Sequence, residues 1–384
     1  MEEKLLNDIV KKYKTPIYIF DIREIKNRIR YLKSKLPKNL KICYAIKANT
    51  FIIKEIENEV DRFEVCSEGE YEICKQNKIT DKKILISGVN KDDDFIKNVL
   101  NTNQNKYFTI ESINQYEVLK NINQPVKAMI RLTSGNQFGI TEEEVKKIIQ
   151  ENLNNTNIEI CGIQYFSETQ KKSINIIKKE LCYIDEFITE LQNELNFKIK
   201  ELEFGTGFPI NYFENNDFNE QEYIEEFSNI FKSVKFQGDI ILEIGRSLVA
   251  SCGNYLTKVV DKKTNKNGNF AIVDGGMNHL VYYGQSMAMK VPKIELFPKR
   301  EEIHKEKWNI CGSLCTINDI LIKQYEIEDL KIGDILIFKN AGAYCMTEGI
   351  SLFLSRNLPQ IIKIKEDGLA YLIRKNIPTY PFNM

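Results

Sequence analysis

The chain has 384 residues, in which 54 Lys and Arg balance 54 Asp and Glu. This length exceeds a typical single hydrophobic core and predicts about two domains. The zero net charge gives no electrostatic reason to expect nucleic acid or an anionic membrane as a partner. The nine cysteines are scattered and only two histidines are present, so no metal site is expected. The charged amphipathic start and the lack of a bilayer-length apolar run predict a cytoplasmic protein.

Short apolar runs alternate with longer amphipathic segments from residue 16 to about residue 245. In chain order, the apolar runs are IYIFD, KICYAIKA, RFEVCS, KILISG, YFTIES, VKAMIRL, EICGIQYFS, IKELEFGTG and DIILEIGR. Strands that alternate with helices indicate a parallel sheet. About eight such units match the scale of a (β/α)8 barrel. The sequence therefore predicts an α/β protein with a (β/α)8 barrel.

The pattern changes after EIGRSLVASCG. The later runs, YLTKVVDKK, GNFAIVDGG, KWNICGSL and DILIFKNAGAY, are short and β-branched, and turn residues separate them. This pattern indicates an antiparallel β domain, either a barrel or a sandwich. We therefore expect an N-terminal segment over 1–20 that packs with the β domain, a barrel over 21–250 and the β domain over 251–384.

Lys47 lies inside the apolar stretch ICYAIKANT. Functional residues of a (β/α)8 barrel gather at the carboxyl ends of the strands, where this lysine falls. A lysine in apolar surroundings has a lowered pKa and can form a Schiff base with a carbonyl. The alternative is a strand-end lysine whose ammonium reaches solvent.

Two further strand ends carry polar chemistry. In EFGTGFP, Gly205 and Gly207 allow backbone amides to approach an anion such as phosphate, and the alternative is the commoner case of an ordinary tight turn. In LEIGRS, Glu243 and Arg246 stand at the next strand end. In one reading, Glu243 and Arg246 form an ion pair with each other. In the other, Glu243 holds a protonated ring nitrogen and Arg246 lies beside a phosphate.

Seven motifs occur in an order that resembles one family. They are YAIKAN, FEVCSEGEYE, FGTGFP, EIGRSLVASCG, DGGMN, CGSLCTINDIL and AGAY. Their order and spacing resemble the fold type III pyridoxal-phosphate decarboxylases. This family includes diaminopimelate and ornithine decarboxylases and is related in fold to alanine racemase. The resemblance extends from about residue 16 to 357 and implies pyridoxal 5'-phosphate as the cofactor.

The resemblance also implies residue roles. Lys47 would hold the cofactor as an aldimine, and Glu243 would bind the pyridine nitrogen so that the ring can accept electrons as a quinonoid. Cys315, contributed by the other subunit of a homodimer with shared active sites, would donate a proton to the substrate carbon. The phosphate contacts implied by the family are Gly205, Thr206, Gly207, Arg246 and Tyr344.

Three departures from the family bear on the substrate. Phe166 replaces a histidine that stacks on the cofactor ring, and Thr316 replaces an acid that binds the substrate's distal amine. Tyr282 and Tyr283 stand where diaminopimelate decarboxylases carry an arginine for the far carboxylate. These departures resemble the subgroup that acts on conjugated or carrier-bound amino acids, such as the glutamyl-carrier decarboxylase of butirosin biosynthesis.

Other readings remain open at the level of sequence. The chain could be a diaminopimelate decarboxylase that makes lysine, an amino-acid racemase with the same cofactor, or an inactive regulator that resembles a decarboxylase. His279 is either a general base or a structural histidine. Asp319 or Glu348 could supply the acid that Thr316 lacks.

Overall fold

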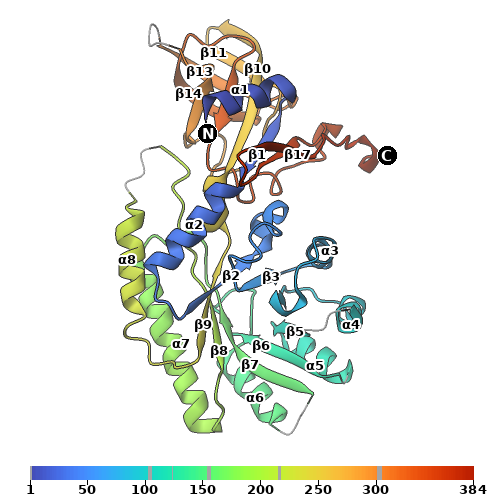
Figure 1. Cartoon of the computed structure of the whole chain (residues 1–384), viewed down its shortest axis with the longest axis vertical. Helices are drawn as coiled ribbons and strands as arrows, with labels where there is room; N and C mark the ends of the chain where they lie inside the picture. Colours follow the sequence, from blue (N-terminus) through green and yellow to red (C-terminus); the bar gives the residue numbers. More distant parts are fainter. Residues whose placement is uncertain (1, 103–105, 123, 154–156, 215–217, 301–304) are drawn as a thin grey trace. The chain divides into compact units, whose positions relative to one another are not determined.

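The computed structural model describes residues 2–102, 106–122, 124–153, 157–214, 218–300 and 305–384. The chain forms two compact units. The barrel unit comprises Arg28–Pro209 and Phe218–Gly245, and the β unit comprises Met1–Asn27, Ile210–Asp217 and Arg246–Met384. Figure 1 shows each unit in the colours of the sequence.

The barrel unit contains a closed barrel of parallel strands, as the alternating pattern predicts. Its strands are β2 (Leu40–Ala45), β3 (Arg62–Val65), β4 (Ile84–Ile86), β5 (Tyr107–Ile110), β6 (Val126–Arg131), β7 (Ile158–Tyr165), β8 (Glu201–Gly205) and β9 (Asp239–Ile244). The barrel closes where β9 pairs in parallel with β2, with Leu40 opposite Ile240. Parallel pairing throughout brings all the carboxyl ends of the strands to one rim.

Helices follow most of the barrel strands (Figure 1). They are α3 (Glu68–Gln76), α4 (Asp93–Thr102), α5 (Ile113–Ile122), α6 (Glu142–Asn152), α7 (Ile174–Leu195) and α8 (Glu220–Ile230), and α2 (Ile22–Lys35) precedes β2. Local chemistry fixes where they begin. A capping box starts α6, because the Thr141 hydroxyl accepts from the Glu144 N–H and the Glu144 carboxylate accepts from the Thr141 N–H.

The β unit contains a nine-stranded sheet. Its strands are β1 (Ile17–Asp21), β10 (Gly253–Asn265), β11 (Gly268–Val273), β12 (Ile294–Phe297), β13 (Lys305–Cys311), β14 (Ile320–Glu328), β15 (Ile335–Phe338), β16 (Gln360–Ile364) and β17 (Ala370–Arg374), and the unit also holds α1 (Glu3–Lys12) and the short α9 (Arg246–Val249). Most pairs are antiparallel, as the turn-rich sequence predicts. Two pairs, β1 with β16 and β11 with β13, are parallel.

The run IYIFD is not a barrel strand. It forms β1, which pairs with β10 and β16 in the sheet of the β unit. All five of its residues are buried, so the run has the continuous apolar character of a parallel barrel strand, and its sequence does not distinguish the two settings. Leu6 and Ile9 of α1 share a core with Ile17 and Ile19 of this strand.

Two kinds of feature are missing from the described part of the chain. None of its helices is both long enough and apolar enough to cross a membrane. Within the same ranges, no group of three or more His, Cys, Asp and Glu side chains is arranged to hold a metal ion.

Candidate active site

Lys47 lies at the carboxyl end of β2, in the single 3-10 turn Ile46–Ala48. Its Nζ is 2.7 Å from Glu64 Oε2, 3.9 Å from Glu243 Oε1 and 3.3 Å from Cys66 Sγ. The Lys47 side chain is 39% exposed, whereas those of Glu64 and Glu243 are 1% and 9% exposed. The amine is thus open to a small molecule at the rim while it contacts two buried carboxylates.

The carboxylates inside the barrel differ in how close a positively charged side chain lies to them. Arg62 pairs with Glu201 at 2.6 Å and with Glu203 at 2.9 Å. Lys47 is more than 1 Å closer to Glu64 than to Glu243. Burial opposes ionisation of Glu64, but the Lys47 ammonium, with smaller contributions from Arg131 and Ser87, lowers the pKa of Glu64 to about 2.

Glu243 behaves in the opposite way. Burial raises the pKa of Glu243 to about 8, and repulsion from the Glu64 carboxylate adds to the rise, while Lys47 only partly opposes it. Gln164 Nε2 lies 3.4 Å from Glu243 and 3.0 Å from Glu203, so one amide bridges the two carboxylates. A second positively charged group beside Glu243 would balance the negative charge of its carboxylate. The protonated ring nitrogen of a pyridoxal cofactor is such a cation, so this donor set fits the cofactor that the resemblance implies.

The glycine turn after β8 consists of Gly205, Thr206 and Gly207. Gly207 has a φ of 60°, and a Cβ there would lie 2.4 Å from the Glu168 carbonyl oxygen, so glycine is required. The Thr206 N–H lies 3.3 Å from the Glu243 carbonyl, and the Thr206 hydroxyl accepts from the Phe208 N–H at 3.3 Å. Within the described ranges, the Gly207 N–H donates to no backbone carbonyl.

Phe166 lies against this turn. A Cβ on Gly205 would come within 2.3 Å of the Phe166 ring, so the ring packs directly on the Gly205 backbone. The half-buried ring can offer its face to a cofactor ring, but it has no nitrogen with which to hydrogen-bond or titrate.

Arg246 begins α9 in the β unit. Its guanidinium carbon lies 4.4 Å from the Tyr344 ring centroid and 4.7 Å from that of Tyr283, and one of its nitrogens donates to Tyr212 Oη at 3.2 Å. Tyr344 has a φ of 62°, an unusual backbone conformation for tyrosine. Three tyrosines therefore orient one buried guanidinium, an anion-binding group.

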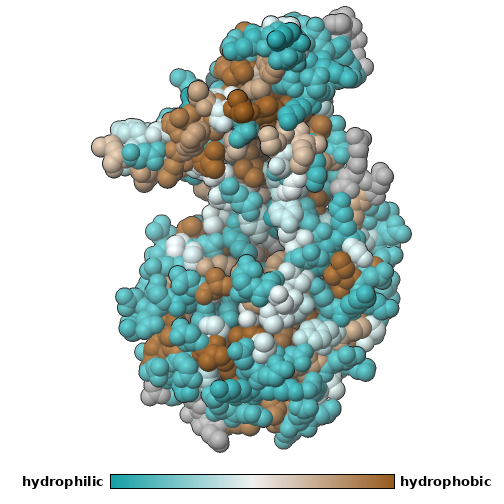
Figure 2. Space-filling model, turned by 180° about the vertical axis from the view of Figure 1, so that it is seen from behind, coloured by the Kyte–Doolittle hydropathy of each residue, from teal (hydrophilic) through white to brown (hydrophobic). Residues whose placement is uncertain are grey.

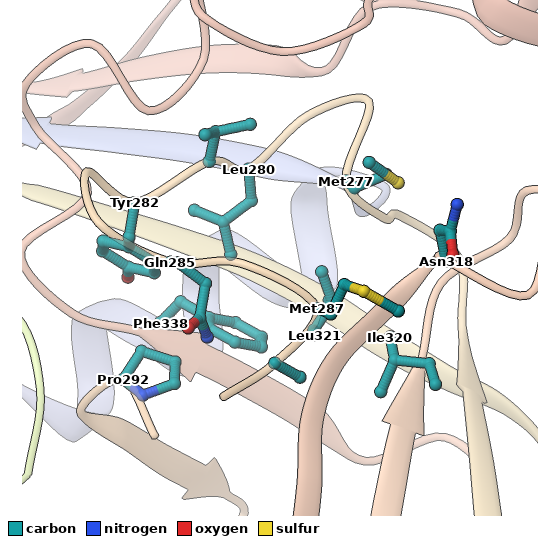
Figure 3. Close-up of a pocket in the computed structure, with 12 residues that line it drawn as sticks. Met277, Leu280, Tyr282, Gln285, Met287, Pro292, Asn318, Ile320, Leu321 and Phe338 are labelled. Atoms are coloured by element: carbon teal, nitrogen blue, oxygen red, sulfur yellow. The ribbon is translucent and has the colours of Figure 1, made fainter. Parts of the chain in front are cut away.

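Tyr282 and Tyr283 differ in environment although they are adjacent. Tyr283 is exposed, whereas Tyr282 is buried and donates to the Lys339 carbonyl at 2.6 Å. Tyr282 also lines a cavity of about 100 Å³ (Figure 3), together with Leu280, Met287 and Phe338. None of the lining residues is charged. This cavity therefore lacks the chemistry to hold a phosphate or a carboxylate.

The CGSLCTIND loop of the β unit presents Cys315 to solvent and holds Thr316 half-buried. Asp319 organises the loop, because one carboxylate oxygen accepts from the Met277 N–H and the other from the Leu314 N–H, both at 2.8 Å. Both Asp319 oxygens thus bind backbone N–H groups, one from Leu314 in the loop and one from Met277 outside it. Glu348 is exposed.

His279 is structural. It is buried, and its ring nitrogens contact Tyr255 Oη at 3.2 Å and the Asn357 carbonyl at 2.9 Å. Burial lowers the pKa of His279 to about 4, so the ring is neutral at physiological pH.

Sequence reasoning missed Glu64, Gln164 and Lys171. Glu64 had a usable signal, since it is a carboxylate in the apolar run RFEVC at a strand end. Gln164 is an amide within a strand, and the neighbouring sequence does not indicate a function for it. Lys171 is fully buried beneath the glycine turn, but in the sequence it stands in a polar loop beside a second lysine.

Comparison with known proteins identifies the class. Residues 17–342 match the family model described as pyridoxal-dependent decarboxylase, C-terminal sheet domain. The chain belongs to this family and is a pyridoxal-phosphate-dependent carboxy-lyase that acts on an amino-acid-type substrate. This match favours the decarboxylase reading over the racemase reading.

Several relatives align over almost the whole chain. The 2-[(L-alanin-3-ylcarbamoyl)methyl]-2-hydroxybutanedioate decarboxylase of Staphylococcus aureus is 25% identical, covering 91% of this chain and 95% of its own. The L-glutamyl-[BtrI acyl-carrier protein] decarboxylase of Niallia circulans is also 25% identical, covering 98% and 94%. Diaminopimelate decarboxylase of Aquifex aeolicus is 27% identical, covering 96% and 91%.

Solved structures share the fold. Diaminopimelate decarboxylase from Helicobacter pylori complexed with L-lysine superposes with a TM-score of 0.85, at 23% identity and 98% coverage of both chains. At this identity the likeness supports the architecture, a (β/α)8 barrel with a sheet domain, and leaves the substrate open.

Proposed function

We propose that this enzyme decarboxylates an amino acid whose distal end is conjugated or tethered rather than a free ammonium. The observation that carries the decarboxylase site is the arrangement of Lys47 between Glu64 and Glu243. A primary amine, a buried anion and a buried carboxylic acid with a strongly raised pKa meet at one barrel rim.

Each residue has a role in this proposal. The cofactor, when bound, supplies an electron sink for the bond that breaks as CO2 leaves. Lys47 holds the cofactor and later moves a proton, and Glu64 keeps the lysine nitrogen in place through its 2.7 Å contact. Glu243, as a carboxylate, would hold the protonated ring nitrogen. The glycine turn binds the phosphate, with Phe166 beside it as the stacking face.

The roles of residues in the β unit rest on the resemblance. Arg246 and Tyr344 are proposed phosphate contacts, and the exposed Tyr283 and the buried Tyr282 are the proposed substrate contacts. Cys315 of the partner subunit is proposed to protonate the substrate carbon, and its exposed position suits a donor that serves another chain.

The substrate proposal depends on Thr316. A threonine hydroxyl cannot neutralise an ammonium, and the nearby acid Asp319 already accepts from two backbone N–H groups. Two relatives agree in chemistry with a conjugated substrate. Their names describe a glutamyl group on an acyl-carrier protein and an alanine joined through a carbamoyl group.

The test is a comparison of CO2 release from free diaminopimelate, lysine and ornithine with release from glutamate tethered to a carrier protein. The proposal expects the tethered substrate to have the highest kcat/KM. The second candidate is diaminopimelate decarboxylase, because many relatives carry that name. Fast turnover of free diaminopimelate would select it and refute the conjugate proposal.

A homodimer with shared sites is part of the proposal. The β unit exposes apolar side chains in two segments, which include Leu352, Phe353 and Leu354 in one and Tyr380 and Phe382 in the other. Asn383 ties them together, since its Nδ2 donates to the Leu352 carbonyl at 2.8 Å. Apolar side chains also gather on the surface seen in Figure 2. Exposed apolar groups of this kind are typical of protein interfaces, and sedimentation equilibrium would measure the assembly.

A further inference from the structure

Lys171 is a buried lysine that none of the roles above uses. It lies in the loop between β7 and α7, and its side chain is 0% exposed. A buried lysine is costly without partners. Its partners therefore show what the fold gains by keeping it.

Lys171 joins the two ends of the glycine turn. Its Nζ donates to the Gly205 carbonyl at 3.3 Å, and its backbone N–H donates to the Gly207 carbonyl at 2.8 Å. The side chain also packs tightly, because a Cβ on Gly207 would lie 3.0 Å from Lys171 Cε. Both carbonyl oxygens therefore face the buried Lys171.

Three neighbouring elements hold Lys171 in this position. Glu180 on α7 accepts from Nζ at 2.6 Å, and Tyr223 on α8 donates to the Lys171 carbonyl at 2.6 Å. The ammonium also lies 5.1 Å from the centroid of the Phe204 ring. The lysine is thus fixed by groups that do not belong to the glycine turn.

We infer that Lys171 is a positioning residue for the cofactor phosphate, which rests on the proposed function that the glycine turn binds that phosphate. In this role it holds two carbonyl oxygens of the turn on the side away from the phosphate, which leaves the Gly207 N–H to face the phosphate. The alternative is an ordinary buried ion pair that only stabilises the barrel. The two differ in whether the effect of Lys171 depends on the phosphate.

The experiment compares pyridoxal 5'-phosphate with pyridoxal. Both carry the same aldehyde and ring, so the ratio of their dissociation constants isolates the phosphate. Each constant is measured by titration of the apoprotein, followed by the absorbance of the bound ligand. We expect Lys171→Met to reduce the preference for the phosphorylated ligand by about tenfold or more, the range of a charge-assisted hydrogen bond.

Lys172→Met is the matched control, because it removes the same charge from the next, exposed residue. It should leave the ratio within about twofold. If Glu180, left unpaired, prevents folding, the double variant Lys171→Met/Glu180→Met removes both charges and should show the same loss of preference. An unchanged ratio in a folded Lys171 variant, or equal weakening of both ligands, would overturn the inference.

Gly207→Ala separates this inference from the proposed function. If the wild-type protein shows no preference for the phosphorylated ligand, the phosphate site itself is wrongly assigned. If Gly207→Ala removes the preference and Lys171→Met preserves it, the turn binds the phosphate and only the role of Lys171 is refuted.

Discussion

Glu243 offers a quantitative test of the charge balance in the barrel. Its pKa is raised from an ordinary 4.5 to about 8 in the unliganded protein. At about 1.4 kcal/mol per pKa unit, this rise corresponds to at most about 5 kcal/mol. Relaxation of the barrel and movement of Lys47 toward Glu243 would reduce that figure.

The sign follows from proton binding. Between pH 4.5 and about 8 the folded apoprotein holds a proton on Glu243 that the unfolded chain has lost. Stability from this group is therefore present below pH 4.5 and is lost as the pH rises through that interval. Glu243→Gln removes the titration, so the variant should resemble wild type near pH 5 and exceed its stability by several kcal/mol, up to about 5, near pH 8.

The assay is urea unfolding of both apoproteins across this pH range, followed by the circular dichroism of the helices. Glu168→Gln is the matched control, since Glu168 is an exposed carboxylate and its curve should parallel wild type. Parallel curves for wild type and Glu243→Gln would refute the claim that Glu243 is protonated and would remove the argument that a cationic ring nitrogen completes the site. Saturation with cofactor should abolish the difference in slope, because Glu243 then remains ionised.

Four further changes probe the other roles. Glu64→Gln removes the carboxylate closest to Lys47 and should lower kcat by about tenfold or more, because a charged hydrogen bond is lost. Absorbance measures the cofactor content of the variant, and full activity would exclude a role for Glu64. Lys47→Ala should abolish turnover, and any steady CO2 release would contradict its assignment. Cys315→Ala should slow turnover without loss of the bound cofactor, and mixing these two variants should restore about a quarter of wild-type activity through hybrid dimers; no recovery would argue against shared sites. Thr316→Asp should raise kcat/KM for free diaminopimelate relative to the tethered substrate, and an unchanged ratio would remove Thr316 from specificity.

The barrel and the residues at its rim can be predicted from the sequence, because the geometry of parallel strands places them. Strand–helix alternation predicts parallel strands, and parallel strands bring Lys47 and Glu243 to the same rim although they are far apart in the chain. The structure brings them to 3.9 Å of each other. The same logic would have selected Glu64, had its carboxylate in an apolar strand been weighed as Lys47 was.

Features that depend on tertiary packing are harder to predict from the sequence. The run IYIFD has the composition of a barrel strand, and only its pairing with β10 and β16 assigns it to the β unit. Lys171 is buried by contacts with α7 and α8, which no local pattern encodes. The sequence likewise does not reveal that both Asp319 oxygens accept from backbone N–H groups.

The decisive measurement is the site of covalent attachment of the cofactor. Holoprotein reduced with borohydride and digested should yield a single pyridoxyl-modified peptide, with the modification on Lys47. An unmodified Lys47 peptide, or the pyridoxyl group on one of the buried lysines Lys91 and Lys171, would contradict the arrangement of the site proposed here.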